Sequence, residues 1–509
     1  MGKIPTSTLR KLFYSMLGLS IVLLVTIFVY QTLDPKSPDQ PPFPVTQSSP
    51  PVTQTPSPVP VHLSAFPGAE GYGSDTVGGR FGRIIVVTNL NDTTNVNSAE
   101  YPGSLRWAIE HTWPDDTNDP YDQRRIIIFK VGGEIKLSTA LHVTHPFTTI
   151  AGQTAPGDGI TLRGEELGIA THDVIVRYIR IRVGDEGLPT CCRDGINIST
   201  TNAESDVYNI IVDHSSVSWA IDENLSIWTR PSKPYKTHDV TIQWSIISEG
   251  LHDSIHVDEG AIETDQHSMG MMLGRDGYNI TIHHNLFANN WRRNPRISGI
   301  VNLEVINNLI YGWGGAAFEF SGDKNVALLL NNYLKANADS KQAEVAFHNP
   351  MNPDSQVYLG GNLADDNRND ETLAPLSVDN PGEFAFAELP QFVPTKVRTS
   401  SAQAAYAEVL KNAGVIFPKR DAVDLRIIEQ VKTRTGKIID SQRQVGGWPV
   451  YQGGSYPADN DNDGIPSDWE SAHGLDPNNA SDASNINSLA PSGYTWIEEY
   501  INSLPPPIN

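Results

Sequence analysis

The chain has 509 residues, of which 39% are hydrophobic and 19% charged, so it is neither a disordered chain nor a membrane-embedded bundle. Its 37 Lys and Arg against 59 Asp and Glu give a net charge of −22, which argues against nucleic acid and anionic lipid as partners, because phosphate contacts need clustered basic residues. The length allows about three domains or one long solenoid. Only two cysteines occur, Cys191 and Cys192, which excludes a disulfide scaffold and a four-cysteine zinc site. We expect two buried thiols rather than a vicinal disulfide.

The N-terminal segment carries a targeting signal. Lys3, Arg10 and Lys11 precede an uncharged, mostly apolar run over residues 12–30. At ~1.5 Å per residue this run nearly crosses a hydrocarbon core of ~30 Å, and no small-residue cleavage site follows it. We predict a signal peptide or signal anchor over residues 1–31, with the anchor favoured and the remainder outside the cytoplasm. Residues 32–62, rich in proline, serine and threonine, are predicted to be an extended linker.

The next segment, residues 63–365, is dominated by short runs of β-branched residues that each end in serine or asparagine. One short helix is predicted within residues 103–110, where Ser104 would cap the helix N-terminus. The strand-like runs are NIIVDHSSV (209–217), VTIQWSII (240–247), ITIHHNLF (280–287), LEVINNLI (303–310), ALLLNNYL (327–334) and VYLGGNLA (357–364). Aligning these runs puts six polar residues in register, namely Ser215, Ser245, Asn285, Asn308, Asn332 and Asn362.

The spacing of these polar residues predicts the fold. They recur at intervals of 30, 40, 23, 24 and 30 residues, and a period of 20–50 residues with one such strand per repeat is typical of a solenoid. Asparagine tolerates the left-handed backbone of a sharp turn and can hydrogen-bond to its copy in the next coil. We therefore predict an all-β fold, a right-handed parallel β-helix. The alternative is a β-sandwich, which would favour hairpin turns.

Two helical segments are expected after Asp365. The sequence AQAAYAEVLKNAG (402–414) predicts a helix that ends at Gly414, and residues 421–439 show further helical periodicity. We expect this partly helical extension to pack along the solenoid or to cover its end.

The tail contains a calcium-binding pattern. DNDNDGIPSDWE (459–470) fits the loop motif D-x-[DN]-x-[DN]-G-x5-E without a gap. Gly464 would make the sharp turn, and a helix over about 467–473 would follow. The alternative is a solvated acidic turn, and the expected role of a bound ion is structural or in cell-wall attachment. The predicted Ca²⁺ ligands are Asp459, Asp461, Asp463, the carbonyl of Ile465, and Glu470.

Five longer motifs occur in order along the chain. They are AFPGAEGYG (65–73), GSLRWAIE (103–110), TIAGQTAPGDGITLRG (149–164), IVDHSSVSWAIDE (211–223) and RRNPR (292–296). With these motifs the chain, from about residue 65 to 449, resembles the pectate lyases of polysaccharide lyase family 1, in the branch with a C-terminal acidic calcium loop. The resemblance implies a β-helix domain over residues 63–450 and a calcium-binding tail over residues 451–509.

The resemblance also implies the reaction. Pectate lyases cleave polygalacturonate by β-elimination, in which a base removes the C5 proton of a uronate and the bond to O4 breaks. Calcium neutralises the uronate carboxylate and stabilises the developing negative charge. The family's first calcium aspartate corresponds to Asp194 and its next acidic ligand to Asp222, with Glu223 beside it. Ser226 stands where the pattern has another carboxylate. The alternative for Asp222 and Glu223 is a solvated turn.

The basic residues come from the RRNPR motif. Arg293 corresponds to the family's catalytic base, and Arg292 and Arg296 are expected to bind the substrate's carboxylates. A surface ion-pair network is the alternative. Met269 occupies the position of a family lysine, so we assign a substrate-binding role to nearby His267, for which a buried structural histidine is the alternative.

We therefore expect an extracytoplasmic, calcium-dependent pectate lyase that acts as a monomer on an acidic polysaccharide. It would touch a membrane only through its N-terminal segment. Two alternatives are a β-helix protein that binds acidic glycans without cleaving them, and a β-helix glycoside hydrolase with paired carboxylates.

Overall fold

In a computed structural model of the chain, residues 62–509 form one compact unit. The structure describes residues 63–113, 123–258, 264–340, 344–348, 352–365, 373–374, 376, 378–379, 386–388, 391–486 and 492–506. The predicted signal segment and linker lie outside these described residues. Within the described part, no helix combines the length and apolar character needed to cross a membrane.

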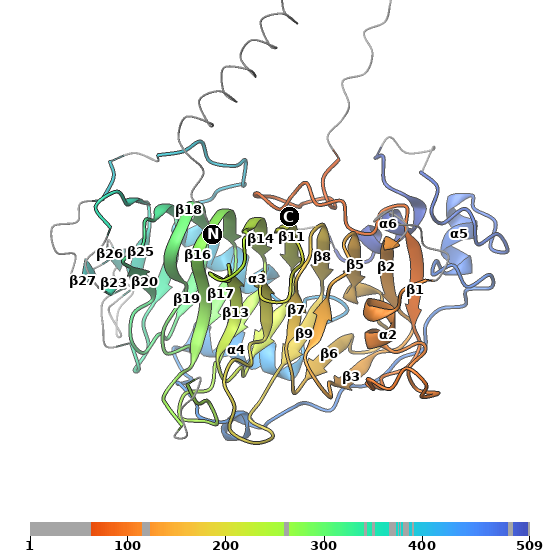
Figure 1. Ribbon diagram of the computed structural model, residues 1–509, viewed down its shortest axis with the longest axis horizontal. Helices are drawn as coiled ribbons and strands as arrows, with labels where there is room; N and C mark the ends of the chain where they lie inside the picture. Colours follow the sequence, from red (N-terminus) through yellow and green to blue (C-terminus); the bar gives the residue numbers. More distant parts are fainter. Residues whose placement is uncertain are drawn as a thin grey trace, which may run out of the picture. The chain divides into compact units, whose positions relative to one another are not determined.

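Three ladders of parallel strands build a β-helix (Figure 1). The first ladder contains β1 (Arg83–Val87), β2 (Arg125–Phe129), β5 (Thr148–Ala151), β8 (Val174–Arg177), β11 (Val207–Asp213), β14 (Thr237–Gln243), the second halves of β16 (Met269–His283) and β18 (Arg296–Ile306), β21 (Val326–Leu330) and β24 (Gln356–Gly360). The second contains β4 (Leu141–Val143), β7 (Leu167–Ile169), β10 (Ile196–Ser199), β13 (Glu223–Trp228), the first halves of β16 and β18, β20 (Phe318–Ser321), β23 (Val345–His348) and β27 (Val378–Asp379).

The third ladder closes each coil. It contains β3 (Gly133–Lys136), β6 (Ile160–Arg163), β9 (Ile179–Arg182), β12 (Ser216–Ser218), β15 (Ile246–Ser248), β17 (Leu286–Ala288), β19 (Leu309–Tyr311), β22 (Tyr333–Lys335) and β25 (Leu363–Asp365). Among the named strands, only β26 (Leu373–Ala374) pairs in antiparallel fashion, with β25. The predicted parallel β-helix is confirmed, and the β-sandwich is excluded.

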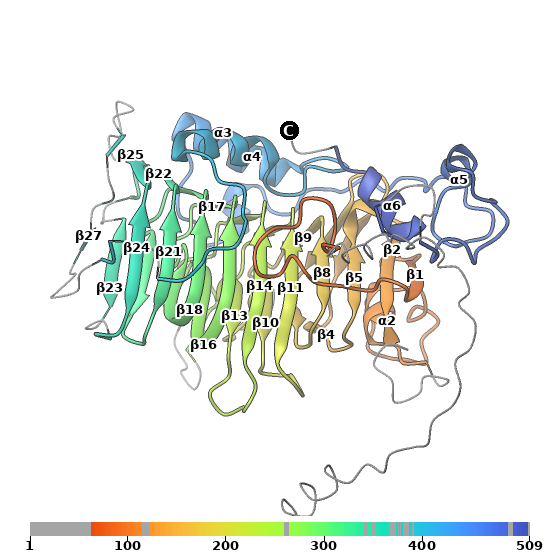
Figure 2. The ribbon, with the colours of Figure 1, turned by 90° about the horizontal axis from the view of Figure 1, so that it is seen from above.

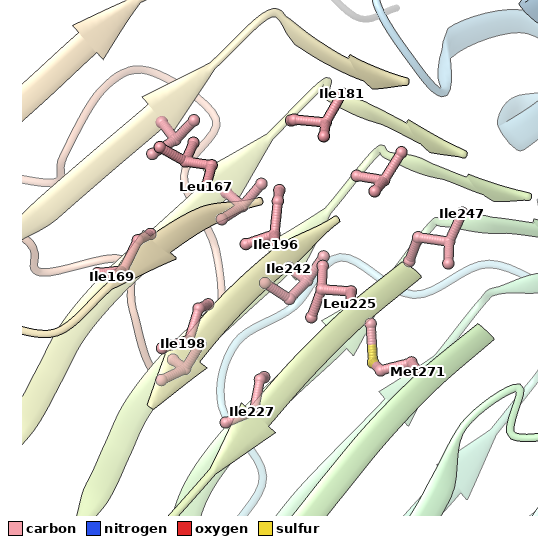
Figure 3. Packing of buried hydrophobic residues seen from close by; sticks show 14 of the residues in the cluster. Leu167, Ile169, Ile181, Ile196, Ile198, Leu225, Ile227, Ile242, Ile247 and Met271 are labelled. Carbon is pink, nitrogen blue, oxygen red and sulfur yellow. The ribbon is translucent and has the colours of Figure 1, made fainter. Parts of the chain in front are cut away.

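The core consists of apolar side chains that stack from coil to coil (Figure 3). Ile196 pairs in register with Leu167 on one side and with Leu225 on the other, and Leu225 pairs with Met271. All four side chains are buried. Because parallel strands in register place like side chains above one another, a one-residue shift would expose the whole row. This register therefore fixes which side chains of the second ladder point outward.

The polar row predicted from the sequence forms a continuous ladder of hydrogen bonds. The amide N–H of Ser215 donates to Oγ of Ser245, and that of Ser245 donates to Oδ1 of Asn285. The same contact continues through Asn308, Asn332 and Asn362. The expectation that these residues adopt the left-handed backbone is wrong. The left-handed residue is the preceding one in each coil, namely His214, Trp244, His284, Asn307, Asn331 and Gly361.

Short helices cover parts of the solenoid. Ser104 caps α2 (Leu105–Glu110) by accepting a hydrogen bond from the amide of Trp107, as predicted. In Figure 2, α3 (Ala402–Asn412) and α4 (Ala422–Thr433) lie along the side of the solenoid. They bury Val409 and Ile427 against Leu286 and Leu309 of the third ladder. The extension therefore packs along the solenoid, although α4 ends six residues earlier than expected, because Arg434 adopts a left-handed conformation.

The tail packs near the N-terminal end of the solenoid. In this part of the chain the 3₁₀ helix η3 (Gln442–Val445) is followed by α5 (Ser467–His473) and α6 (Trp496–Ser503). A second short 3₁₀ helix, η2 (Gly152–Thr154), follows β5 within the solenoid. Ile465, Trp496 and Ile501 pack against Ile126 and Ile128 of β2. The acidic loop is therefore attached to the first coils through an apolar cluster.

Candidate active site and a second acidic cluster

A cleft with a volume of about 620 Å³ lies on the second ladder. Three of its lining residues, Ser226, Met272 and Arg296, are paired in register on β13, β16 and β18. Since side chains on a strand alternate between the two faces, this row points outward while its neighbours Leu225 and Met271 point into the core. The strands of this ladder and the loops that flank them contribute the charged residues of the cleft.

The three predicted carboxylates of the cleft lie together. Asp194 precedes β10, Asp222 precedes β13, and Glu223 is the first residue of β13. One carboxylate oxygen from each of these residues lies within 4.8 Å of the other two. The amide of Glu223 donates a hydrogen bond to Oδ1 of Asp194 at 3.2 Å. Coils that are adjacent in space thus bring together residues 29 positions apart in the sequence.

The electrostatic environments of these carboxylates differ. Asp194 is 4% exposed, and burial, followed by the charges of Asp222 and Glu166, raises the pKa of Asp194 well above its usual value. Burial also acts to raise the pKa of Asp222, but His267, His256 and Arg293 outweigh it, so that this pKa is lowered. A buried, like-charged cluster of this kind is stabilised when a cation binds among the carboxylates.

Glu166 is a member of this cluster that the sequence analysis missed. It lines the same cleft, and burial, together with the charges of Glu165 and Asp222, raises the pKa of Glu166 to about 7. It is the second residue after the motif at 149–164, within RGEELG (163–168), but nothing in its spacing indicated that it would lie near Asp194.

Arg293 lies directly beside the carboxylates. It sits in the loop between β17 and β18 with φ of 58°, and its Nη1 atom forms an ion pair with Oε1 of Glu223. Burial, and then the neighbouring Arg296, lowers the pKa of Arg293, although three nearby carboxylates oppose this shift. The geometry therefore brings the predicted base to the predicted metal ligands.

The other two arginines of the motif have different surroundings. Arg296 lines the cleft, and no carboxylate of the described residues forms an ion pair with it. Arg292 is not among the residues that line the cleft, and its Nε atom pairs with Oε1 of Glu319 at 2.8 Å. The motif thus presents two of its three guanidinium groups to the cleft. Arg275 is a further lining arginine that the sequence analysis did not identify.

His267 and the two cysteines also line the cleft. Nε2 of His267 lies 2.7 Å from Oδ1 of Asp222, so this histidine faces a carboxylate of the cluster. Met269 pairs in register with Glu223 but is buried and is not among the residues that line the cleft. Both cysteines are free, but the prediction that they are buried is wrong, because Cys191 is half-buried and Cys192 is exposed. They lie in a loop rather than in a coil of the solenoid.

The carboxylates fit a calcium ion by their chemistry. The three carboxylates offer oxygen donors, and Ca²⁺ takes six to eight such ligands in a flexible arrangement. Ser226, where a further carboxylate was expected, lines the cleft with Asp194, and its hydroxyl acts to lower the pKa of Asp194. Asp194, Asp222 and Glu223 would hold the ion.

The acidic loop of the tail forms a second cluster. Ligand atoms of Asp459, Asp461 and Asp463 lie within 4.8 Å of one another, and so do those of Asp463, Glu470 and Asp482. Gly464 makes the turn with φ of 95°, and α5 begins at Ser467, as predicted. A Cβ atom on Gly464 would lie 2.4 Å from Cδ1 of Ile128, so glycine is required both for the turn and for packing on β2.

The side chains of this loop leave oxygen atoms unsatisfied. Glu470 is 0% exposed, and neither of its carboxylate oxygens has a hydrogen-bond partner among the described residues. One buried carboxylate oxygen each of Asp461, Asp463 and Asp482 also has no hydrogen-bond partner among the described residues. Burial, followed by the charges of Asp463 and Asp461, raises the pKa of Glu470 to about 7. A bound cation would satisfy these oxygens, and Asp482 is a candidate ligand that the linear motif did not include.

Comparison with known proteins identifies the family of the chain. No family model matches the chain. It is, however, 36% identical over 453 residues to a protein of Neosartorya fischeri named "Probable pectate lyase C", a match that covers 87% of this chain and 94% of that protein. A protein of Emericella nidulans with the same name is 35% identical over 456 residues, 87% of this chain and 93% of that protein. The chain belongs to the pectate lyase family.

Solved structures of similar fold include the cedar pollen allergen Jun a 1, which is 21% identical with a TM-score of 0.46 over 68% of this chain and 93% of that chain.

Proposed function

We propose that this protein is a calcium-dependent pectate lyase that cleaves polygalacturonate by β-elimination. The observation that carries the proposal is the convergence of Asp194, Asp222 and Glu223 in one cleft, with Arg293 paired to Glu223. The motifs alone do not require these groups to meet, since they come from separate coils of the solenoid.

The charge of the cleft explains why a cation is needed. The lining carboxylates outnumber the lining arginines by six to four; they are Glu166, Asp194, Asp222, Glu223, Asp258 and Asp323 against Arg230, Arg275, Arg293 and Arg296. A polyuronate would be repelled by an excess of negative charge unless cations lay between it and the protein. Calcium held by Asp194, Asp222 and Glu223 would neutralise a uronate carboxylate and so favour loss of the C5 proton.

Arg293 is the group that we assign to proton removal. A guanidinium is normally charged, but burial and the charge of Arg296 both act to lower its pKa. Arg296, free of protein ion pairs among the described residues, would bind a substrate carboxylate. Arg292 is paired with Glu319 and lies outside the lining of the cleft, so the proposal leaves it no direct role.

The test of the proposed function uses the full chain, polygalacturonate, and calcium or a chelator. β-Elimination creates a double bond in the product, so we expect ultraviolet absorbance to rise with calcium and to stop on chelation. Binding of the polymer without absorbance would instead indicate a glycan-binding protein. New reducing ends without absorbance would indicate a glycoside hydrolase. Either result would overturn the proposal.

For the tail we propose a calcium ion with a structural role. The ligands are Asp459, Asp461, Asp463, Glu470 and the carbonyl of Ile465, with Asp482 in addition. The support is the set of unsatisfied buried oxygens together with the packing of Ile465 on Ile126 and Ile128. Lys130, next to β2, also forms an ion pair with Asp459 at 2.9 Å. An ion that fixes the conformation of the loop would therefore hold the tail against the first coils.

We also propose that the enzyme works outside the cytoplasm as a monomer, on a membrane anchor or after release from it. The support for this location is the apolar N-terminal run and the proline-rich linker. Fractionation of cells that produce the full chain, followed by mass determination of the extracytoplasmic fraction, tests location and oligomeric state together.

A further inference from the structure

Two histidines and one aspartate converge at one edge of the cleft. Asp222 lies in the turn before β13, His256 follows β15, and His267 precedes β16. His256 is 3% exposed and His267 is 7% exposed, so both rings are buried although they line an open cleft. Their rings stack, with centroids 4.0 Å apart.

Both imidazoles direct the same nitrogen atom toward the same carboxylate oxygen. Nε2 of His267 lies 2.7 Å from Oδ1 of Asp222, and Nε2 of His256 lies 3.9 Å from it. Despite the short distance, Nε2 of His267 makes no hydrogen bond of good geometry and is buried. Two ligands of one ion, each bonded at about 2.0–2.2 Å, cannot lie more than about 4.4 Å apart, and both distances satisfy this limit.

A second carboxylate orients one of the rings. Nδ1 of His256 is paired with Oδ1 of Asp265, which leaves Nε2 as the nitrogen that faces Asp222. In protein metal sites, a ligating histidine almost always gives its other ring N–H to a carboxylate or carbonyl in this manner. An ordinary salt bridge between Asp222 and one histidine would need neither the second ring nor its orientation by Asp265.

We propose that Asp222, His256 and His267 form a binding site for a divalent transition-metal ion of the zinc class, next to the carboxylate cluster with which it shares Asp222. Imidazole nitrogens suit zinc, copper and nickel, whereas calcium takes oxygen ligands. Three protein ligands leave coordination positions open toward the cleft. This inference rests on the proposed function only where it concerns the effect of the ion on substrate. Binding of the metal ion itself is measured without substrate.

A metal ion at this site would supply positive charge to a cleft that is lined by no lysine of the described residues. A dication at His256 and His267 would therefore add to the four arginines in offsetting the excess of carboxylates around a bound polyanion. The ion would sit beside Asp222, whose other neighbours Asp194 and Glu223 provide the oxygen donors.

The experiment uses the full chain, stripped with a chelator and then held in excess calcium so that the oxygen-lined sites are filled. Co²⁺ is added as a spectroscopic probe, and Zn²⁺ binding is measured by calorimetry. We expect visible d–d absorption typical of nitrogen ligation and one additional bound Zn²⁺ per chain. His256→Gln and His267→Gln should weaken Zn²⁺ binding by more than about 100-fold, and Asp265→Asn by about 10- to 100-fold.

Two controls make the result specific. His252→Gln alters a nearby histidine whose ring contacts that of Trp291 in a tilted arrangement and does not line the cleft, and it should leave Zn²⁺ binding unchanged. The double variant Cys191→Ser, Cys192→Ser should also bind Zn²⁺ normally, although both thiols line the cleft. Loss of binding in this thiol variant with retention in His267→Gln would overturn the proposal in favour of a thiol site.

A folding defect in the histidine variants cannot mimic the expected result, because the wild-type protein provides its own test. With Cu²⁺ bound, its electron paramagnetic resonance spectrum should show hyperfine coupling to two imidazole nitrogens. A spectrum without nitrogen coupling, or an absence of Zn²⁺ binding in excess calcium, would overturn the proposed site. Either outcome would leave the calcium-dependent absorbance assay, and therefore the proposed lyase function, unaffected.

Discussion

The two acidic clusters of this molecule contain similar side chains but differ in their surroundings. In the cleft, Asp222 is held at a lowered pKa by histidines and an arginine, while Asp194 has a raised pKa. In the tail, burial and like charges raise the pKa values of both Asp463 and Glu470 to about 7. Carboxylates mixed with bases and open to a cleft are suited to a reaction, whereas closed, unsatisfied carboxylates are suited to a structural ion.

The largest effect is expected on activity, from a substitution in the cleft. Arg293→Gln removes the proposed base, so the rate of unsaturated-product formation should fall by about 10²- to 10⁴-fold. Arg292→Gln is the matched control, because Arg292 is paired with Glu319 outside the lining of the cleft. Circular dichroism should show both variants folded. Equal activity of the two variants would remove Arg293 from catalysis.

The second effect separates catalysis from calcium-dependent stability. Asp194→Asn removes a central ligand, and activity at saturating substrate should fall at least about 100-fold, since a bound metal ion supplies several kcal/mol of transition-state stabilisation. The variant should nevertheless keep the thermal stabilisation that calcium provides through the tail. Asp253→Asn, a change at an exposed aspartate outside the cleft, is the control. Full activity of Asp194→Asn would contradict the assigned calcium site.

The reverse pattern is expected in the tail. Calcium at 100 times its dissociation constant should raise the free energy of unfolding by about 2.7 kcal/mol, measured by urea titration with and without the ion. Glu470→Gln should lose most of this stabilisation and keep its activity at low temperature. Glu429 is exposed on α4, so Glu429→Gln should keep both the stabilisation by calcium and the activity. If Glu470→Gln lost activity but kept the stabilisation by calcium, the structural role of the tail ion would be contradicted.

A smaller effect should be equal with and without calcium. Asn308→Ala removes one member of the polar ladder and leaves the amide of Asn285 without its acceptor. We expect the free energy of unfolding to fall by about 1–3 kcal/mol in both conditions. Asn97→Ala, at an exposed position, is the control. A loss seen only in calcium would mean that the ladder is coupled to one of the two metal clusters.

A pH-dependent effect is expected in acid. Burial lowers the pKa of His283 to about 3 from 6.5, so the unfolded chain binds a proton in this range and the folded chain does not. The stability contributed by neutral His283 is complete above pH 6.5 and is lost as the pH falls toward 3. His283→Gln should reduce this slope in urea titrations, independently of calcium. An unchanged slope would show that other groups account for the loss.

The fold was largely predictable from the sequence, because strand register in a parallel stack repeats the same residue types at the same place. Ser245 and Asn308 could be aligned without coordinates, and they do lie in one ladder. What the alignment could not give was the backbone conformation of each turn. It assigned the left-handed position to the polar residue, whereas His214 and Trp244, each one residue earlier, adopt it.

The site was predictable only where a motif named the residue. Asp194, Asp222, Glu223 and Arg293 were found through the family resemblance, and the structure brings them together. Glu166 and Asp482 were missed, because they join their clusters through the arrangement of coils and turns rather than through sequence spacing. Motif adjacency in turn suggested a common substrate-binding role for Arg292 and Arg296, although of these two only Arg296 lines the cleft.

The central claim is that the carboxylate cluster holds calcium beside Arg293. The most direct measurement is a crystal structure of the protein with calcium and a uronate oligomer. We predict an ion at about 2.3–2.6 Å from oxygens of Asp194, Asp222 and Glu223, with a uronate carboxylate on the ion and the Arg293 guanidinium facing C5 of that sugar. Calcium found only in the tail, with the oligomer bound away from Arg293, would contradict the claim.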